Sequence, residues 1–114
     1  MTQKKLDVKK LMDRSGKHNR ACQALMKYLC DIGHTCARFS GSEVNPADVM
    51  ACDLHDSQTP LRLIIVSIGR WPAHKARSRL QRFLVKTVHC RGSAVKAVVH
   101  NKVWDFSFEP VLPA

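Results

Sequence analysis

The sequence predicts a single mixed α/β domain in which two helices flank a mixed sheet of five strands. Three observations predict this fold class. Apolar residues recur at helical spacing in two segments, 18–32 and 73–90, while the segments between and after them have the short apolar runs of strands. The resulting order is helix, three strands, helix, two strands. A chain of 114 residues suits one such domain and is short for two.

The first helix is predicted over residues 18–32. Its apolar stripe recurs every three or four positions, at Ala21, Leu25, Tyr28, Leu29 and Ile32. Gly33 follows directly, as a C-terminal cap often does. The Ser15–Gly16 pair indicates a break before this helix. Residues 1–16 are therefore predicted to be a basic N-terminal arm or a short helix, and residues 17–114 the α/β domain.

Five segments have the character of strands. Three lie between the helices, at 34–39, 47–55 and 61–68, and two follow the second helix, at 94–99 and 103–108. The segment 61–68, LRLIIVSI, is almost continuously apolar, which predicts a central strand buried on both faces. Asn101–Lys102 is predicted to form the turn between the last two strands.

The second helix is predicted over residues 73–90, with Pro72 near its start and Gly92 at its end. One face is apolar and is formed by Ala76, Leu80, Phe83, Leu84 and Thr87. Another face is basic and is formed by Lys75, Arg79, Arg82 and Lys86. Because residues 69–92 contain no acidic side chain, we favour a surface that contacts phosphates over a merely solvated helix face.

The charge of the chain points to a polyanionic partner. Its 19 Lys and Arg exceed its 9 Asp and Glu by 10. These positive side chains repel one another in the folded chain unless a polyanion binds them. Nucleic acid is the leading candidate, before an anionic membrane surface or an acidic protein. Beyond the basic helix face, the candidate nucleic-acid contacts are Arg70, Arg77, Lys9, Lys10, Lys17 and Arg20.

Cysteine usage and hydropathy predict a cytoplasmic protein without a membrane segment. The five cysteines are odd in number and include no CxxC pair, so reduced thiols are favoured over a secreted disulfide scaffold. The longest apolar stretch is far too short for a bilayer, and the amino terminus lacks the apolar core of a secretory signal. The cysteines and histidines do not form the paired spacing of a structural zinc site, so we expect no cofactor.

Four segments together resemble the PD-(D/E)xK nuclease superfamily, and in particular archaeal-type Holliday junction resolvases. They are CDIGHTCARFSGS at the end of the first helix, NPADVMA, LIIVSIGR, and the basic helix with KARSRLQRFL. The resemblance covers residues 16–108 and implies a restriction-endonuclease or resolvase-like α-β-β-β-α-β-β fold. It also implies a homodimer.

The resemblance further implies a metal site, most of which this chain lacks. In the family, a carboxylate on the first helix, an Asp opening strand two and a Glu on strand three hold Mg²⁺, and a Lys two residues on orients the attacking water. Only Asp48 matches. The other positions fall near Cys22, at or beside Ile65, and at or beside Ser67, and residues 61–69 contain no acid and no lysine. Hard divalent cations require several oxygen ligands.

Three functions are compatible with this loss. We favour a catalytically inactive nuclease fold that binds nucleic acid, double-stranded or branched DNA in particular, through phosphates. The second is a Mg²⁺-dependent nuclease with a migrated site, in which Glu43 joins Asp48. The third is a protein–protein interaction module. For Asp48 itself, a structural role, hydrogen-bonded to loop amides at the strand edge, is favoured over a catalytic one.

Overall fold

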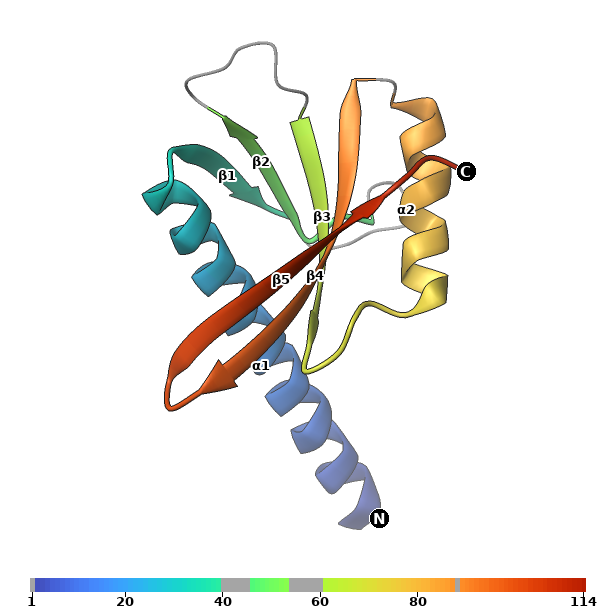
Figure 1. Cartoon of the computed structure of the whole chain (residues 1–114). Helices are drawn as coiled ribbons and strands as arrows, with labels where there is room; N and C mark the ends of the chain where they lie inside the picture. The colour runs from blue at the N-terminus through green and yellow to red at the C-terminus, as the bar shows by residue number, and fades with distance from the viewer. Residues whose placement is uncertain (1, 40–45, 54–60, 88) are drawn as a thin grey trace.

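The structure is a computed structural model that describes residues 2–39, 46–53, 61–87 and 89–114, with side chains from residue 16 onward. Along the chain, its elements are α1 (Thr2–Asp31), β1 (His34–Arg38), β2 (Val49–Asp53), β3 (Leu61–Ile68), α2 (His74–Lys86), β4 (Cys90–His100) and β5 (Val103–Val111) (Figure 1). This element order confirms the predicted mixed α/β fold class. Neither helix in the described part of the chain is long and apolar enough to cross a membrane.

The five strands form one mixed sheet in the order β1-β2-β3-β4-β5. The central pair, β3 and β4, is parallel, and every other neighbouring pair is antiparallel. A parallel pair needs a crossover connection, which α2 supplies. The predicted central position of 61–68 is therefore confirmed, and its continuous apolar character follows from burial on both faces of the sheet.

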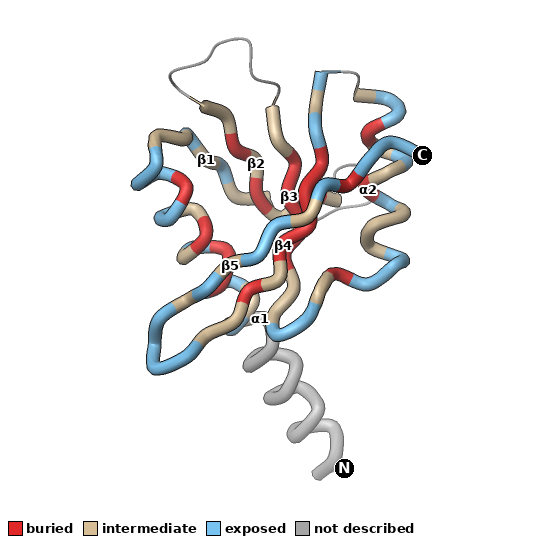
Figure 2. Tube along the Cα trace, in the orientation of Figure 1, coloured by how far each residue is buried: buried red, intermediate tan, exposed pale blue. Residues whose placement is uncertain are grey.

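The hydrophobic core has two layers, one on each face of the sheet. In the first layer, α1 packs Ala21, Leu25 and Leu29 against alternate residues of β2, β3 and β4. In the second layer, α2 packs Leu80 and Leu84 against the intervening residues of β3 and β4. Successive side chains of a strand point to opposite faces, so α1 and α2 cover opposite faces. Figure 2 shows the buried residues concentrated where the strands cross the middle of the sheet.

The break predicted at Ser15–Gly16 is wrong, because α1 continues through both residues from Thr2 to Asp31. A glycine inside a helix costs only about 1 kcal/mol relative to alanine, which the neighbouring helical residues can offset. The boundary between residues 1–16 and 17–114 therefore falls inside one helix. At the other end the prediction holds, since Gly33 has a φ of 98°, the left-handed conformation of a helix C-terminal cap.

Gly92 does not end the second helix, as the sequence had suggested. The helix α2 ends at Lys86, and Gly92 lies inside β4. A Cβ atom at Gly92 would lie 2.6 Å from Leu84 Cδ1 and 2.8 Å from the backbone oxygen of Val111. This glycine therefore allows α2 and β5 to approach β4 closely.

The second strand begins at Val49, two residues later than predicted, and the last two strands differ more. They are longer than predicted, because β4 begins at Cys90 and β5 continues through Pro110 to Val111. Proline is tolerated there because β5 is an edge strand. The predicted turn is confirmed: Asn101 and Lys102 have φ angles of 50° and 66°, as a two-residue hairpin turn requires.

Candidate nucleic-acid interface

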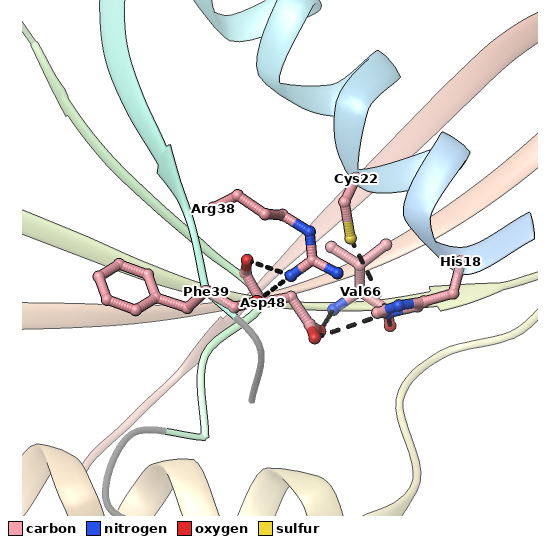
Figure 3. Close-up of polar contacts among 6 residues, drawn as sticks. All are labelled: His18, Cys22, Arg38, Phe39, Asp48 and Val66. Atoms are coloured by element: carbon pink, nitrogen blue, oxygen red, sulfur yellow. Dashed lines mark hydrogen bonds and ion pairs between the residues drawn. The ribbon is translucent and has the colours of Figure 1, made fainter. Parts of the chain in front are cut away.

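Asp48 is held in place by its own backbone, immediately before β2. Its N–H donates to the Ile64 carbonyl of β3 at 2.8 Å, and its carbonyl accepts from the Phe39 N–H at 2.8 Å. The same carbonyl accepts from Arg38 Nη1 at 2.7 Å, and this guanidinium also donates to the Phe39 carbonyl. The residue is thus tied to the strands on both sides, which fixes the direction of its carboxylate (Figure 3).

The carboxylate of Asp48 has two partners, one on β3 and one on α1. Its Oδ2 accepts a hydrogen bond from the Val66 N–H at 2.8 Å, and its Oδ1 lies 3.6 Å from His18 Nε2. The side chains of Asp48 and His18 are 17% and 33% exposed. The structural role favoured for Asp48 is therefore compatible with the geometry, but the partners are a central-strand amide and an imidazole instead of loop amides.

His18 is the group that compensates the charge of Asp48. The hydrogen bond to Asp48 raises the pKa of the His18 imidazole from 6.5 to about 10, with a smaller contribution from Cys22, while partial burial opposes the shift. The imidazole is therefore protonated at neutral pH. Its Nε2 also lies 3.2 Å from the Val66 carbonyl and 3.9 Å from Cys22 Sγ (Figure 3). The ion pair thus connects α1 to the start of β2, and the contacts of both residues with Val66 connect the pair to β3.

The described side chains around Asp48 do not fit a Mg²⁺ ion. The resemblance places the helix carboxylate of the family near Cys22, but Cys22 is buried in the core. The helix residue that faces Asp48 is instead His18, one turn earlier. The β3 residues that pack toward α1 are Ile64, Val66 and Ile68, all apolar, and they lie one position away from Ile65 and Ser67. Among the described residues, no three His, Cys, Asp or Glu side chains gather to hold a metal ion. An imidazolium and one engaged carboxylate cannot replace several oxygen ligands.

A cleft of about 400 Å³ lies beside this ion pair, between α1 and the C-terminal end of β3. Its lining residues are Lys17, His18, Val66, Ser67, Ile68 and Arg70. The floor is partly apolar, and the ionisable lining side chains are all basic. Lys17 and Arg70, both predicted as nucleic-acid contacts from the sequence, are exposed here. The structure therefore brings two residues that are 53 positions apart in the sequence to one cleft.

A second basic surface lies on α2 and is called here the basic α2 face. It comprises Lys75, Arg79, Arg82 and Lys86, all of which are exposed. The apolar face predicted for this helix is confirmed, since Leu80 and Leu84 are buried and Ala76 and Phe83 pack around them. Because α1 and α2 cover opposite faces of the sheet, the predicted contacts are divided between the cleft and the basic α2 face.

Arg77 is placed differently from the other basic residues of α2. Its Nη1 donates to Glu109 Oε1 at 2.5 Å, and its Nε donates to the Pro72 carbonyl at 3.1 Å. The guanidinium carbon also lies 5.9 Å from the centre of the Trp71 ring. These contacts connect α2 to β5 and give Arg77 an internal partner, while its phosphate contact stays a prediction.

Other candidates can be placed only in part. Arg20 is exposed on α1, one turn after the cleft residues. The side chains of Lys9 and Lys10, and all of Glu43, lie outside the described residues. His18 was missed from the sequence, although it precedes Cys22 by one helical turn and so lies on the face predicted to pack against the sheet.

The strand order and the two flanking helices define the class: this is a nuclease-like fold of the resolvase type. The structure is similar to that of Hjc, a Holliday junction resolvase from Archaeoglobus fulgidus, an archaeal hyperthermophile, with a TM-score of 0.61. The two chains are 17% identical over 83% of this chain and 73% of that one. No protein-family model and no curated protein matches the sequence. The resemblance inferred from the sequence is confirmed for the fold.

Proposed function

We propose that this protein binds nucleic acid, double-stranded or branched DNA in particular, through a resolvase-type fold that has no nuclease activity of its own. The His18–Asp48 ion pair is the observation that carries the proposal. The carboxylate that would bind a metal ion is already engaged by an imidazolium and by the Val66 amide. A metal-dependent nuclease needs an ion to polarise the phosphate and to activate water.

The basic α2 face supports the binding part of the proposal. Its four cations are exposed, and residues 69–92 contain no acidic side chain to neutralise them. Contacts of Lys and Arg with phosphates carry no sequence information and are strongly salt-dependent. We therefore expect weak sequence preference and a steep loss of affinity as the salt concentration rises.

Binding and cleavage are tested in one experiment. Labelled duplex, four-way junction, single-stranded DNA and RNA are incubated with the protein in the presence of Mg²⁺ or Mn²⁺. We expect complexes with duplex or junction DNA and no cleavage above background. Metal-dependent cleavage that is lost in Asp48→Ala would overturn the inactive assignment and favour the migrated-site nuclease. Loss of the same cleavage in Glu43→Ala would identify the second ligand of that nuclease.

The surface is tested by salt titration of two matched variants on the same helix. If Arg79 contacts a phosphate, Arg79→Gln should flatten the slope of log affinity against log salt by about 0.9. Arg77→Gln removes the same charge from a residue that is paired with Glu109, and should leave the slope unchanged. Equal changes in both variants would show that net charge, and not the basic α2 face, determines binding. No binding at about 50 mM salt would favour the interaction module.

We also infer a cytoplasmic homodimer that uses no cofactor. All five cysteines are free thiols, which supports a reducing compartment. The dimer is implied by the resemblance to resolvases. Sedimentation equilibrium of the purified protein tests it, and a monomer at micromolar concentration would contradict it.

A further inference from the structure

The cleft beside the ion pair differs from the basic α2 face, because it is a concave site on the other side of the sheet. We propose that this cleft binds one backbone phosphate of the nucleic acid without a metal ion, with Lys17 and Arg70 as the direct contacts and with His18 neutralising Asp48. This inference rests on the proposed function and adds the cleft to the basic α2 face as a second site of nucleic-acid contact. It places a phosphate beside the position where the resemblance implies a metal ion.

The shape and lining of the cleft suit a phosphate group. Its cations come from two separate parts of the chain, Lys17 and His18 on α1 and Arg70 directly after β3. A water molecule occupies about 30 Å³ of liquid, so about 400 Å³ leaves room for a phosphate group together with the adjoining sugar atoms. The ammonium and guanidinium groups are strong donors to phosphate oxygens.

The charge balance of the cleft requires His18. Asp48 contacts two residues of the cleft lining, His18 and Val66, and a free carboxylate at that position would repel a phosphate. The ion pair with His18 and the hydrogen bond from the Val66 amide engage both carboxylate oxygens. The charges of Lys17 and Arg70 are then left to act on an anion. The site is thus selective for anions, whereas the metal site of the family binds cations.

The cleft and the basic α2 face can act on the same ligand. Arg70 precedes Lys75, the first cation of that face, by five residues. Five residues span at most about 18 Å of extended chain. One nucleic-acid molecule can therefore contact the cleft with one phosphate and α2 with others.

The cleft is tested first with inorganic phosphate as the probe, independently of DNA. In a ¹H–¹⁵N NMR titration, we expect saturable shifts of the Ser67 and Ile68 amides. The double variant Lys17→Gln/Arg70→Gln should bind phosphate at least tenfold more weakly. The matched control Lys27→Gln/Lys102→Gln removes the same charge from two exposed positions outside the lining and should bind as the wild type does. Equal weakening in both double variants, or shifts that do not saturate, would overturn the proposal.

The role of His18 is tested by a charge-rescue pair. His18→Asn leaves Asp48 uncompensated and should weaken phosphate binding by at least tenfold. His18→Asn/Asp48→Asn removes both charges and should restore most of the affinity. Unchanged binding in His18→Asn, in protein whose amide spectrum remains folded, would contradict the proposed role.

DNA binding distinguishes failure of the cleft from failure of the proposed function. At fixed low salt, Lys17→Gln/Arg70→Gln should lower duplex affinity at least threefold more than the matched Lys27→Gln/Lys102→Gln control. If wild-type protein binds DNA and the two double variants are equal, the cleft proposal fails and the proposed function stands. If wild-type protein binds inorganic phosphate in the cleft but binds no nucleic acid, the proposed function fails, and with it the assignment of a nucleic-acid phosphate to this cleft.

Discussion

The ion pair between His18 and Asp48 should make the stability of the protein fall at alkaline pH. The pKa of His18 is raised from 6.5 to about 10 in the folded state, chiefly by the hydrogen bond to Asp48. A group whose pKa is raised on folding stabilises the protein fully below its unfolded pKa. The contribution is therefore complete below pH 6.5 and is lost progressively as the pH rises toward about 10.

The magnitude follows from the shift and from the exposure of the pair. At 1.36 kcal/mol per pKa unit, a shift from 6.5 to about 10 corresponds to roughly 5 kcal/mol. Solvent reaches the His18 side chain, which is 33% exposed, and screens its interaction with Asp48. The contact of 3.6 Å is also longer than a hydrogen bond, which lowers the contribution further. We therefore expect a loss of about 2 kcal/mol in the free energy of unfolding across this pH range.

The assay is urea unfolding at pH 6.5 and at pH 10, the two ends of the His18 transition. The variant His18→Asn should lose about 2 kcal/mol less than the wild type between these pH values, because it has no imidazolium to deprotonate. The control His100→Asn removes an exposed histidine at the end of β4 and should behave as the wild type does. Titration of other lysine, tyrosine and cysteine side chains is common to all three proteins. An equal loss in His18→Asn and the wild type would refute the reasoning.

Four further results are expected from the packing and the site. Gly92→Ala should lower the free energy of unfolding by about 1–3 kcal/mol in urea titrations, because the added Cβ would lie 2.8 Å from a backbone oxygen. Gly16→Ala, in the interior of α1, should instead raise it by about 0.5–1 kcal/mol. Tyr28→Leu should destabilise by about 1 kcal/mol, because the ring centre lies 5.7 Å from that of Phe106 and 6.4 Å from that of Phe108. Mg²⁺ or Mn²⁺ should not raise Tm in thermal unfolding, since the described residues around Asp48 do not fit a metal ion; a concentration-dependent rise would contradict that assignment.

The elements that were predicted correctly are those whose signal is local. The continuous apolar run of 61–68 indicates burial on both faces, and the structure places this segment at the centre of the sheet. The apolar stripes of the two helices follow from side chains that recur every three or four residues. The Asn101–Lys102 turn follows from the residue types that a tight hairpin accepts. None of these predictions requires a partner from elsewhere in the chain.

The glycines show where local signals fail. A glycine after a helical segment is read as a helix end, which is correct for Gly33 and wrong for Gly92. The reason for Gly92 is contact with Leu84 and Val111, which come from α2 and β5. The sequence contains no local mark that separates a glycine needed for a turn from one needed for close packing. Gly16 is a third case, because it lies inside a helix that continues past it.

The partners of His18 could not be assigned from the sequence for the same reason. Its partners Asp48, directly before β2, and Val66, on β3, are 30 and 48 residues away in the chain. A half-buried carboxylate is costly unless a cation and hydrogen-bond donors accompany it. In a metal-dependent nuclease the metal ion is that cation. The imidazolium of His18 and the Val66 amide are such partners here, so the contacts of Asp48 with α1 and β3 account for its burial.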